Sequence, residues 1–208
     1  MLNIVVLVSG GGTNLQALLD AEEKCEIIGG RIMHVISSNP DAYALKRAIR
    51  SGISTTVVDR RAFDTSKEFD AELLDVLKSC KPDLIVLAGF LCILGESIIR
   101  QYHNRIINVH PSLIPAFCGK GYYGLNVHKS VLAYGVKLTG ATVHFVNEIP
   151  DGGAIIMQKA VPVLATDTPE TLQLRVMRQA EWEILPRAVS LFCQEKISVK
   201  DNIAIIND

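Results

Sequence analysis

Two short runs of purely apolar residues limit the folds that this chain can adopt. Residues 4–8 read IVVLV and residues 84–88 read LIVLA. A strand with one face in water alternates apolar and polar residues, so uninterrupted apolar runs are typical of central strands in a parallel sheet that is covered on both faces. Parallel neighbours require long crossover connections, which are usually helices. We therefore expect an α/β fold.

The first half of the chain alternates between short β-branched runs and longer amphipathic stretches, which predicts βαβ units with right-handed crossovers. The expected parallel strands span residues 3–8, 31–37, 55–58, 83–88 and 105–109. The expected helices span residues 14–23, 42–51 and 66–79, with a short one after Gly95. This half therefore predicts a mainly parallel central sheet with helices on both faces.

The pattern changes in the second half. After His128 we expect a short helix and then two strand-like runs, ATVHFV and AIIMQKAVPV, which the turn-rich stretch NEIPDGG separates. A long helix at about residues 170–192 follows. Strands joined by a short turn pair antiparallel, so we expect an antiparallel extension of the same sheet. Because no repeat or low-complexity linker marks a boundary, we expect a single domain over residues 1–208.

Composition and charge exclude several classes of partner. With 49% hydrophobic residues and a formal net charge of −1, the chain has no basic excess to attract nucleic acid. The apolar run at the N-terminus is too short to cross a membrane and lacks the features of a signal peptide. The five cysteines form no C-x-x-C pair, which argues against disulfides and a zinc site. We therefore expect a cytoplasmic protein without a metal that binds small molecules.

A glycine-rich turn follows the first expected strand directly. The sequence S-G-G-G-T-N-L places Gly10, Gly11, Gly12, Thr13 and Asn14 at the start of a helix. Glycines bring backbone N–H groups close to an oxyanion, and the helix dipole favours negative charge there. The spacing matches neither G-x-G-x-x-G nor G-x-x-x-x-G-K-[ST], which disfavours nicotinamide and nucleoside triphosphates. A phosphate site is the hypothesis, and a plain helix cap without a ligand is its alternative.

The fifth expected strand ends in a polar cluster. In RIINVHPSLIP, Asn108, His110 and Ser112 surround a proline turn at the carboxyl end of a buried strand, where α/β sheets bind their ligands. Buried Asn and His side chains require partners, so their presence needs a reason. A histidine beside an amide donor can stabilise a developing oxyanion. This pair therefore suits acyl transfer.

Two later residues extend this hypothesis. Asp151 lies in the turn P-D-G-G, where a carboxylate near His110 could raise the pKa of the histidine or accept protons from an attacking amine. An ordinary turn aspartate is the alternative, since D-G-G is a common turn sequence. His144, in T-V-H-F-V, is expected either to point into the cleft or to make a structural hydrogen bond. His144 and Ser112 are both assigned to a supporting position behind the catalytic residues.

Five segments resemble one known family, in collinear order over almost the whole chain. They are NIVVLVSGGGTNLQALL, LIVLAGFLCIL, INVHPSLIP, TVHFVNEIPDGGAIIMQ and RVMRQAEWEILP. Together they resemble the folate-dependent phosphoribosylglycinamide formyltransferases of purine synthesis. N-x-H-P-S with a later D-G-G is shared by the wider formyl-transfer superfamily. The opening S-G-G-G-T-N-L and the closing A-E-W-x-x-L-P are similar to the glycinamide ribonucleotide branch.

The resemblance implies a Rossmann-like formyltransferase fold. Its N-terminal half, about residues 1–105, would bind the nucleotide phosphate, and about residues 106–208 would bind folate and carry the catalytic residues. It implies transfer of formyl from the co-substrate 10-formyltetrahydrofolate to the amine of glycinamide ribonucleotide, without a metal. The products would be formylglycinamide ribonucleotide and tetrahydrofolate. A monomer and a homodimer both stay open.

The resemblance also assigns roles to individual positions. Asn108, His110 and Asp151 match the catalytic asparagine, histidine and aspartate of the family. The resemblance implies direct attack of the amine on the formyl carbon, with His110 and Asn108 stabilising the oxyanion and Asp151 managing the protons. Glu181 and the glycine turn match its ribonucleotide-binding residues, the turn being Gly11, Gly12, Thr13 and Asn14. The folate-binding walls match Phe90, Leu91, Cys92, Ile93 and Leu94, together with Val146, Asn147, Glu148 and Ile149.

One departure and two alternative functions stay open. The loop AFCGKGYYGLNVH is longer and more aromatic than in many relatives; Lys120, Tyr122 and Tyr123 either close over the ligands or belong to a flexible surface loop. A hydrolase of 10-formyltetrahydrofolate shares N-x-H-P-S, although it usually carries an additional N-terminal domain and this chain begins directly at a strand. A non-catalytic phosphosugar-binding protein is the second alternative, because fold alone does not prove function.

Overall fold

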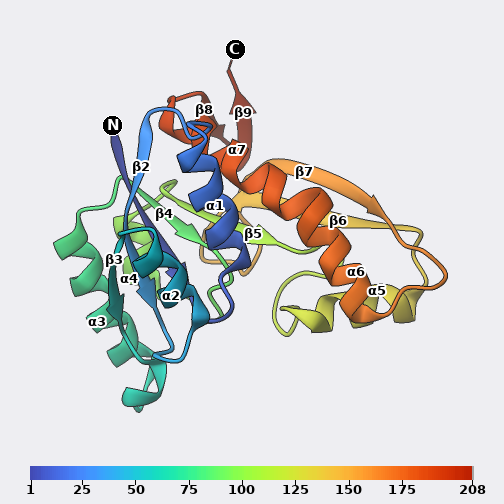
Figure 1. Cartoon of the computed structure of the whole chain (residues 1–208), viewed down its shortest axis with the longest axis horizontal. Coiled ribbons are helices and arrows are strands. Elements are labelled where there is room, and N and C mark those ends of the chain that lie inside the picture. The colour runs from blue at the N-terminus through green and yellow to red at the C-terminus, as the bar shows by residue number, and fades with distance from the viewer. Residues whose placement is uncertain (208) are drawn as a thin grey trace.

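The central feature of the computed structural model, which describes residues 1–207, is a seven-stranded sheet of order β3-β2-β1-β4-β5-β6-β7. The first five strands in sequence are parallel, and β6 and β7 are antiparallel. The strands are β1 (Leu2–Val8), β2 (Gly30–Ser37), β3 (Ser54–Val57), β4 (Leu84–Leu87), β5 (Ile106–His110), β6 (Leu138–Phe145) and β7 (Ile155–Pro162). Figure 1 shows the extension formed by β6 and β7.

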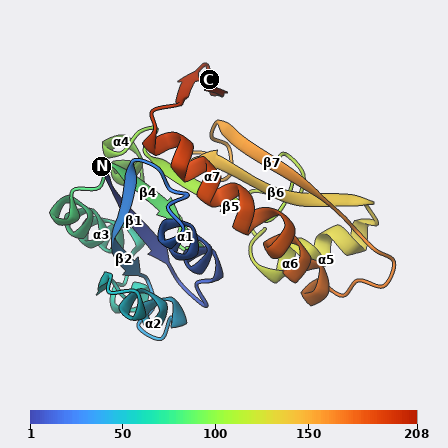
Figure 2. The same ribbon diagram turned by 45° about the horizontal axis from the view of Figure 1, so that its top comes forward.

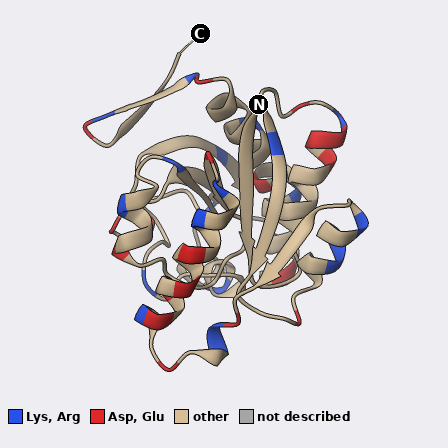
Figure 3. Ribbon diagram, turned by 90° about the vertical axis from the view of Figure 1, so that its left-hand side faces the viewer, with Lys and Arg blue, Asp and Glu red and all other residues tan. Residues whose placement is uncertain are grey.

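Helices connect the strands and cover the sheet. They are α1 (Thr13–Glu23), α2 (Tyr43–Arg50), α3 (Ser66–Cys80), α4 (Glu96–Gln101), α5 (Leu125–Tyr134), α6 (Pro169–Val176) and α7 (Trp182–Cys193). A 3₁₀ turn spans Arg60–Ala62, and a π-helical turn, Met177–Glu181, joins α6 to α7 (Figure 2). Figure 3 shows charges of both signs on the helices and loops of one side. No helix among residues 1–207 has the length and apolarity that crossing a membrane requires.

The alternation of side chains along β1 produces two hydrophobic layers. Ile4, Val6 and Val8 face one layer, which contains residues of α1, α2, α5, α6 and α7. Val5 and Leu7 face the other layer, which α3 and α4 cover. Successive side chains of a strand point to opposite faces, so a continuous apolar run buries both faces of the sheet. The IVVLV and LIVLA runs occupy the adjacent central strands β1 and β4.

The predicted fold class is confirmed, with each expected parallel strand and the antiparallel extension present. Three features differ from the expectation. The long C-terminal helix is interrupted by the π-helical turn, and His128 lies inside α5 rather than before it. A C-terminal hairpin, β8 (Ile197–Lys200) and β9 (Ile203–Ile206), was not predicted because its strands are only four residues long.

The close contact between β6 and β7 can be tested by its effect on stability. A Cβ atom added to Gly140 in β6 would lie 2.0 Å from the carbonyl oxygen of Lys159 in β7. We expect Gly140→Ala to lower the free energy of unfolding by about 1–3 kcal/mol, since overpacking displaces backbone. Urea unfolding followed by fluorescence of Trp182, the one tryptophan, measures this change. The control Leu138→Ala, at a 60% exposed position of β6, should change stability much less; equal effects would contradict the prediction.

Candidate functional site

A pocket of about 710 Å³ brings together segments from both halves of the chain. All of the predicted site residues line it except Ser112. They are the glycine turn 11–14, the segments 90–94 and 146–149, Asn108, His110, His144, Asp151 and Glu181. The turn follows β1, the segment 90–94 follows β4, and His110 ends β5. Carboxyl ends of parallel strands meet at one edge of a sheet, which explains how remote segments reach one pocket.

The glycine turn presents the start of α1 to this pocket. Gly12 is the N-cap residue, with φ of 71°, and α1 has no side-chain cap. The Gly10 carbonyl accepts a hydrogen bond from the Ala44 N–H, and the Gly11 carbonyl accepts one from Arg47 Nε (2.9 Å). A Cβ at Gly12 would lie 2.6 Å from that of Ala44. With these carbonyls directed at α2, the uncapped N–H groups of α1 are suited to an anion.

Glu181 is a buried carboxyl beside this turn. Asn14 Nδ2 donates a hydrogen bond of 2.6 Å to Glu181 Oε2. Burial raises the pKa of Glu181 to about 7, although the hydrogen bond from Asn14 acts in the opposite direction. Asn14 Oδ1 is also buried and has no hydrogen-bond partner. Glu181 ends the π-helical turn, a distortion that often occurs at functional sites.

Asn108 and His144 face each other across β5 and β6. His144 Nδ1 lies 2.7 Å from the carbonyl oxygen of Phe145, which only accepts, so Nδ1 carries a proton. In neutral His144, Nε2 then accepts a hydrogen bond from Asn108 Nδ2 at 3.2 Å. This contact fixes the amide so that the second N–H of Asn108 remains available on the pocket side. The pairing of β5 with β6 therefore orients a hydrogen-bond donor.

The protonated nitrogen of His110 is identified in the same way, from a contact with a backbone carbonyl. Its Nε2 lies 2.9 Å from the carbonyl oxygen of Phe117, so Nε2 is the protonated nitrogen of the neutral ring. Its Nδ1 lies 3.6 Å from Asp151 Oδ2. Burial lowers the pKa of His110, and the charge of Asp151 opposes that effect. Neutral His110 thus presents an unprotonated Nδ1, which can accept a proton but cannot donate one.

Asp151 occupies a strained turn between these histidines. Its φ is 56°, in the left-handed region that non-glycine residues seldom adopt. Its Oδ2 accepts a hydrogen bond of 2.8 Å from the Gly119 N–H, and its Oδ1 lies 3.6 Å from His144 Nε2. Burial would raise the pKa of Asp151, but contacts with His144, His110 and Gly119 outweigh burial and lower it. Asp151 is therefore ionised at neutral pH.

Exposed apolar side chains mark the walls of the pocket. Leu91 and Ile93 follow β4 with exposed fractions of 63% and 71%, and Ile149 is 65% exposed. The Leu91 N–H donates to Ser9 Oγ (2.9 Å), which ties this wall to the end of β1. Burial raises the pKa of the Cys92 thiol, which is therefore neutral. Two apolar walls beside a few polar groups are typical of sites for planar organic ligands.

Ser112 does not line the pocket, and its expected supporting position stays a prediction. It is fully buried, its hydroxyl donates to the Ala116 carbonyl (2.6 Å), and its own carbonyl accepts from Thr142 Oγ1 (2.7 Å). These bonds hold the loop after β5 against β6, so Ser112 supports the site through the backbone. Among residues 1–207, no group of His, Cys, Asp or Glu side chains is arranged to hold a metal ion.

Sequence reasoning missed several lining residues, among them Gln173 and Met177, and left one loop open. Gln173 and Met177 line the pocket from α6 and the π-helical turn. Their spacing of four residues, continued by Glu181, was the available signal, because residues four apart share a helix face. Lys120, Tyr122 and Tyr123 of the aromatic loop also line the pocket.

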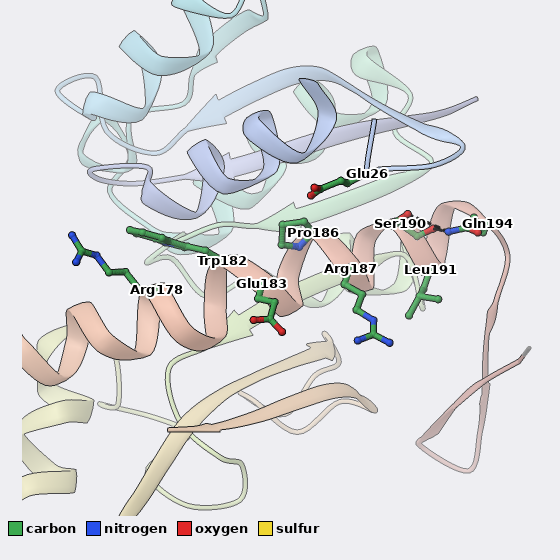
Figure 4. A pocket seen from close by; sticks show the side chains of 9 residues that line it. All are labelled: Glu26, Arg178, Trp182, Glu183, Pro186, Arg187, Ser190, Leu191 and Gln194. Atoms are coloured by element: carbon green, nitrogen blue, oxygen red, sulfur yellow. Dashed lines mark hydrogen bonds between the residues drawn. The ribbon is translucent and has the colours of Figure 1, made fainter. Parts of the chain in front are cut away.

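A second hollow, of about 520 Å³, lies along α7 (Figure 4). It is lined by charged and apolar side chains, among them Trp182, Pro186 and Arg187. None of the predicted site residues lines it. We therefore place the functional site in the larger pocket at the carboxyl ends of the strands.

Comparison with known proteins agrees with this site. The model of the formyl transferase family matches residues 2–189. Phosphoribosylglycinamide formyltransferase of Escherichia coli K12 is 40% identical over 203 residues, covering 98% of this chain and 92% of the relative. Glycinamide ribonucleotide transformylase 1 from Symbiobacterium toebii superposes with a TM-score of 0.93 at 41% identity, covering 100% of this chain and 95% of the other.

A more distant structure bears on the hydrolase alternative. A formyltetrahydrofolate deformylase from Pseudomonas syringae pv. tomato gives a TM-score of 0.87 at 28% identity, covering 99% of this chain but 66% of the deformylase. Identity is thus higher to the transferases than to this hydrolase. The chain belongs to the formyl transferase family, in its phosphoribosylglycinamide formyltransferase branch.

Proposed function

We propose that this protein transfers the formyl group of 10-formyltetrahydrofolate to the amine of glycinamide ribonucleotide in purine biosynthesis. The observation that carries the proposal is one pocket with the glycine turn, the apolar walls, and the group Asn108, His110 and Asp151. The names of the relatives at 40% identity support the same reaction. All five cysteines are free thiols, which supports our proposal that the enzyme works in the reducing cytoplasm.

In this proposal the ribonucleotide binds at the glycine turn. Its phosphate accepts hydrogen bonds from the uncapped N–H groups at the start of α1. Glu181 and the unpartnered Asn14 Oδ1 are acceptors at the same end of the pocket, and they bind polar groups of the glycinamide ribonucleotide. The apolar walls at 90–94 and 146–149 hold the folate ring, so the formyl group and the amine meet near His110.

The reaction begins with attack of the neutral amine on the formyl carbon. A carbon–nitrogen bond forms, and the carbonyl becomes an oxyanion that the free N–H of Asn108 stabilises. His110 Nδ1 takes the amine proton, and the ionised Asp151 stabilises the resulting imidazolium. The bond to folate N10 then breaks while His110 returns a proton to that nitrogen. No covalent enzyme intermediate is required. Burial raises the pKa of the nearby Cys118 thiol, and this disfavours the thiolate that a covalent mechanism would use.

Absorbance measurements test the transferase against the hydrolase. Purified protein is mixed with 10-formyltetrahydrofolate, with and without glycinamide ribonucleotide. We expect tetrahydrofolate only when the ribonucleotide is present. Product in its absence would identify a hydrolase, and no product in either case would favour a phosphosugar-binding protein.

Replacement of His110 separates catalysis from binding. We expect His110→Ala to lower kcat by about 10²–10⁴-fold, because the group that carries the amine proton is lost. Calorimetric affinity for glycinamide ribonucleotide should change little, since the glycine turn and Glu181 are intact. A loss of affinity with unchanged kcat would contradict the catalytic role.

The pH dependence of kcat follows from the lowered pKa values of His110 and Asp151. The pKa of His110 lies below 6.5, so kcat should be constant at neutral pH and fall once His110 becomes protonated below that value. In Asp151→Asn, the charge that opposes burial is lost, so the pKa of His110 decreases further. The acid fall should therefore move to lower pH while the plateau decreases. A fall near pH 8, the ordinary range of an α-amine at about 7.7–8.0, that persists in Asp151→Asn would instead report the substrate amine.

Glu181, which we propose binds the substrate, should lower the free energy of unfolding at neutral and higher pH. Its pKa is about 7 in the folded chain and 4.5 ordinarily, so the folded state binds the proton more tightly and stability falls as pH rises from 4.5 to 7. Glu181→Gln removes this loss, and we expect a gain of about 2–3 kcal/mol at pH 8 that vanishes near pH 4.5. KM for the ribonucleotide should rise about tenfold. An equal stability change at both pH values would contradict this account.

A further inference from the structure

The C-terminal hairpin reaches the turn that carries Asp151. Ile197, Val199 and Ala204 pack on the main hydrophobic core, and β9 contacts the edge strand β7. Figures 1 and 2 show the hairpin beyond the end of α7. Its two strands are joined by Asp201 and Asn202, with φ of 51° and 59°. Left-handed residues of this kind form tight hairpin turns.

Two amide groups meet at one carbonyl oxygen beside Asp151. Asn202 Nδ2 donates a hydrogen bond of 3.0 Å to the Gly152 carbonyl. Asn147 Nδ2 donates to the same oxygen at 3.1 Å. Asn147 lies in the segment between β6 and β7, whereas Asn202 lies 50 residues after Gly152 in the chain. The tip of the hairpin therefore contacts the Gly152–Gly153 peptide, which begins one residue after the proposed catalytic residue Asp151.

This turn needs external support because its conformation is strained and closely packed. Asp151 has a φ of 56°. A Cβ atom at Gly153 would lie 1.8 Å from the Phe145 carbonyl oxygen, so the turn is pressed against the end of β6. Residues in sparsely populated backbone conformations persist only where their surroundings hold them. Fixing the Gly152 carbonyl holds the Gly152–Gly153 peptide in place, and this limits how far the neighbouring backbone that carries Asp151 can shift.

We propose that the hairpin is a positioning element and that Asn202 is its positioning residue. Asn202 is exposed and does not line the pocket, so it acts through Gly152 and Asp151 rather than on a substrate. The support continues across the pocket, because Asp151 Oδ2 accepts the Gly119 N–H of the aromatic loop. The expected effect of Asn202 on turnover rests on the proposed function. The expected effect on the distance between Asp151 and His110 does not.

The hairpin contains its own matched control. Asn207 Nδ2 donates to Ser198 Oγ at 3.5 Å, a contact that stays within the hairpin. Asn202→Gly removes the amide and keeps the left-handed conformation free of strain. Asn202→Asp keeps the size of the side chain but replaces the donor by an acceptor. Asn207→Ala removes a side-chain contact of the same element without touching the turn.

Kinetics and NMR together test the proposal. We expect kcat to fall about tenfold in Asn202→Gly and Asn202→Asp with both KM values nearly unchanged, because small displacements of catalytic groups are costly. Histidine NMR titration, with His110 assigned by His110→Ala, should show a lower pKa for His110 in Asn202→Gly, since the Asp151 charge that raises this pKa moves away. Asn207→Ala should leave both quantities unchanged, and Trp182 fluorescence should show similar melting temperatures for the variants.

Two outcomes would overturn the proposal. An unchanged His110 titration in Asn202→Gly would show that the hairpin does not hold Asp151. An equal fall of kcat in Asn207→Ala would assign the effect to hairpin stability. Because the titration needs no substrate, it decides the proposal even if the unaltered protein fails to transfer formyl, which would refute the proposed function alone.

Discussion

The pairing of β5 with the antiparallel β6 is the constraint on which the rest of the site depends. It sets Asn108 opposite His144, and it directs the chain after Phe145 into the turn that carries Asp151. A shift of β6 by one residue would turn His144 to the face of the sheet opposite to Asn108. The parallel strands β1 and β4 then need only end at the same edge to add the glycine turn and the wall at 90–94.

Backbone groups, more than side chains, determine the protonation of this site. The carbonyls of Phe117 and Phe145 accept from one nitrogen of His110 and His144, respectively, which leaves a basic nitrogen on each ring. Backbone carbonyls cannot donate, so this assignment does not depend on the ligand. Asp151 lies 3.6 Å from the second nitrogen of each ring, and its charge opposes the effect of burial on the pKa of His110. The arrangement favours a base that becomes a cation during the reaction.

The sheet, the glycine turn and the polar cluster at the end of β5 could be predicted from the sequence for physical reasons that are local, whereas Glu181 and the walls at 90–94 and 146–149 were assigned through the family resemblance. IVVLV and LIVLA are buried on both faces, and the end of β5 carries Asn108 and His110, so periodicity and chain order suffice. The hydrogen-bond partner of Ser112, the π-helical turn and the Asn202 contact could not be predicted in this way. Each depends on where segments far apart in sequence meet, and β8 and β9 are too short to give a periodic signal.

Two carboxyls of the pocket lie where the chain departs from regular geometry. Glu181 is buried at the end of a π-helical turn, and Asp151 is held in a left-handed conformation. A regular helix or turn would avoid strain but would direct these carboxyls elsewhere, and burying a carboxyl lowers stability unless a donor compensates. The hydrogen bond from Asn14 offsets the burial of Glu181 only in part, because the pKa of Glu181 is still about 7. Asp151 differs, because its contacts with Gly119 and two histidines lower its pKa and keep it ionised. The two carboxyls therefore differ in protonation at neutral pH, which suits one to binding and the other to stabilising a catalytic cation.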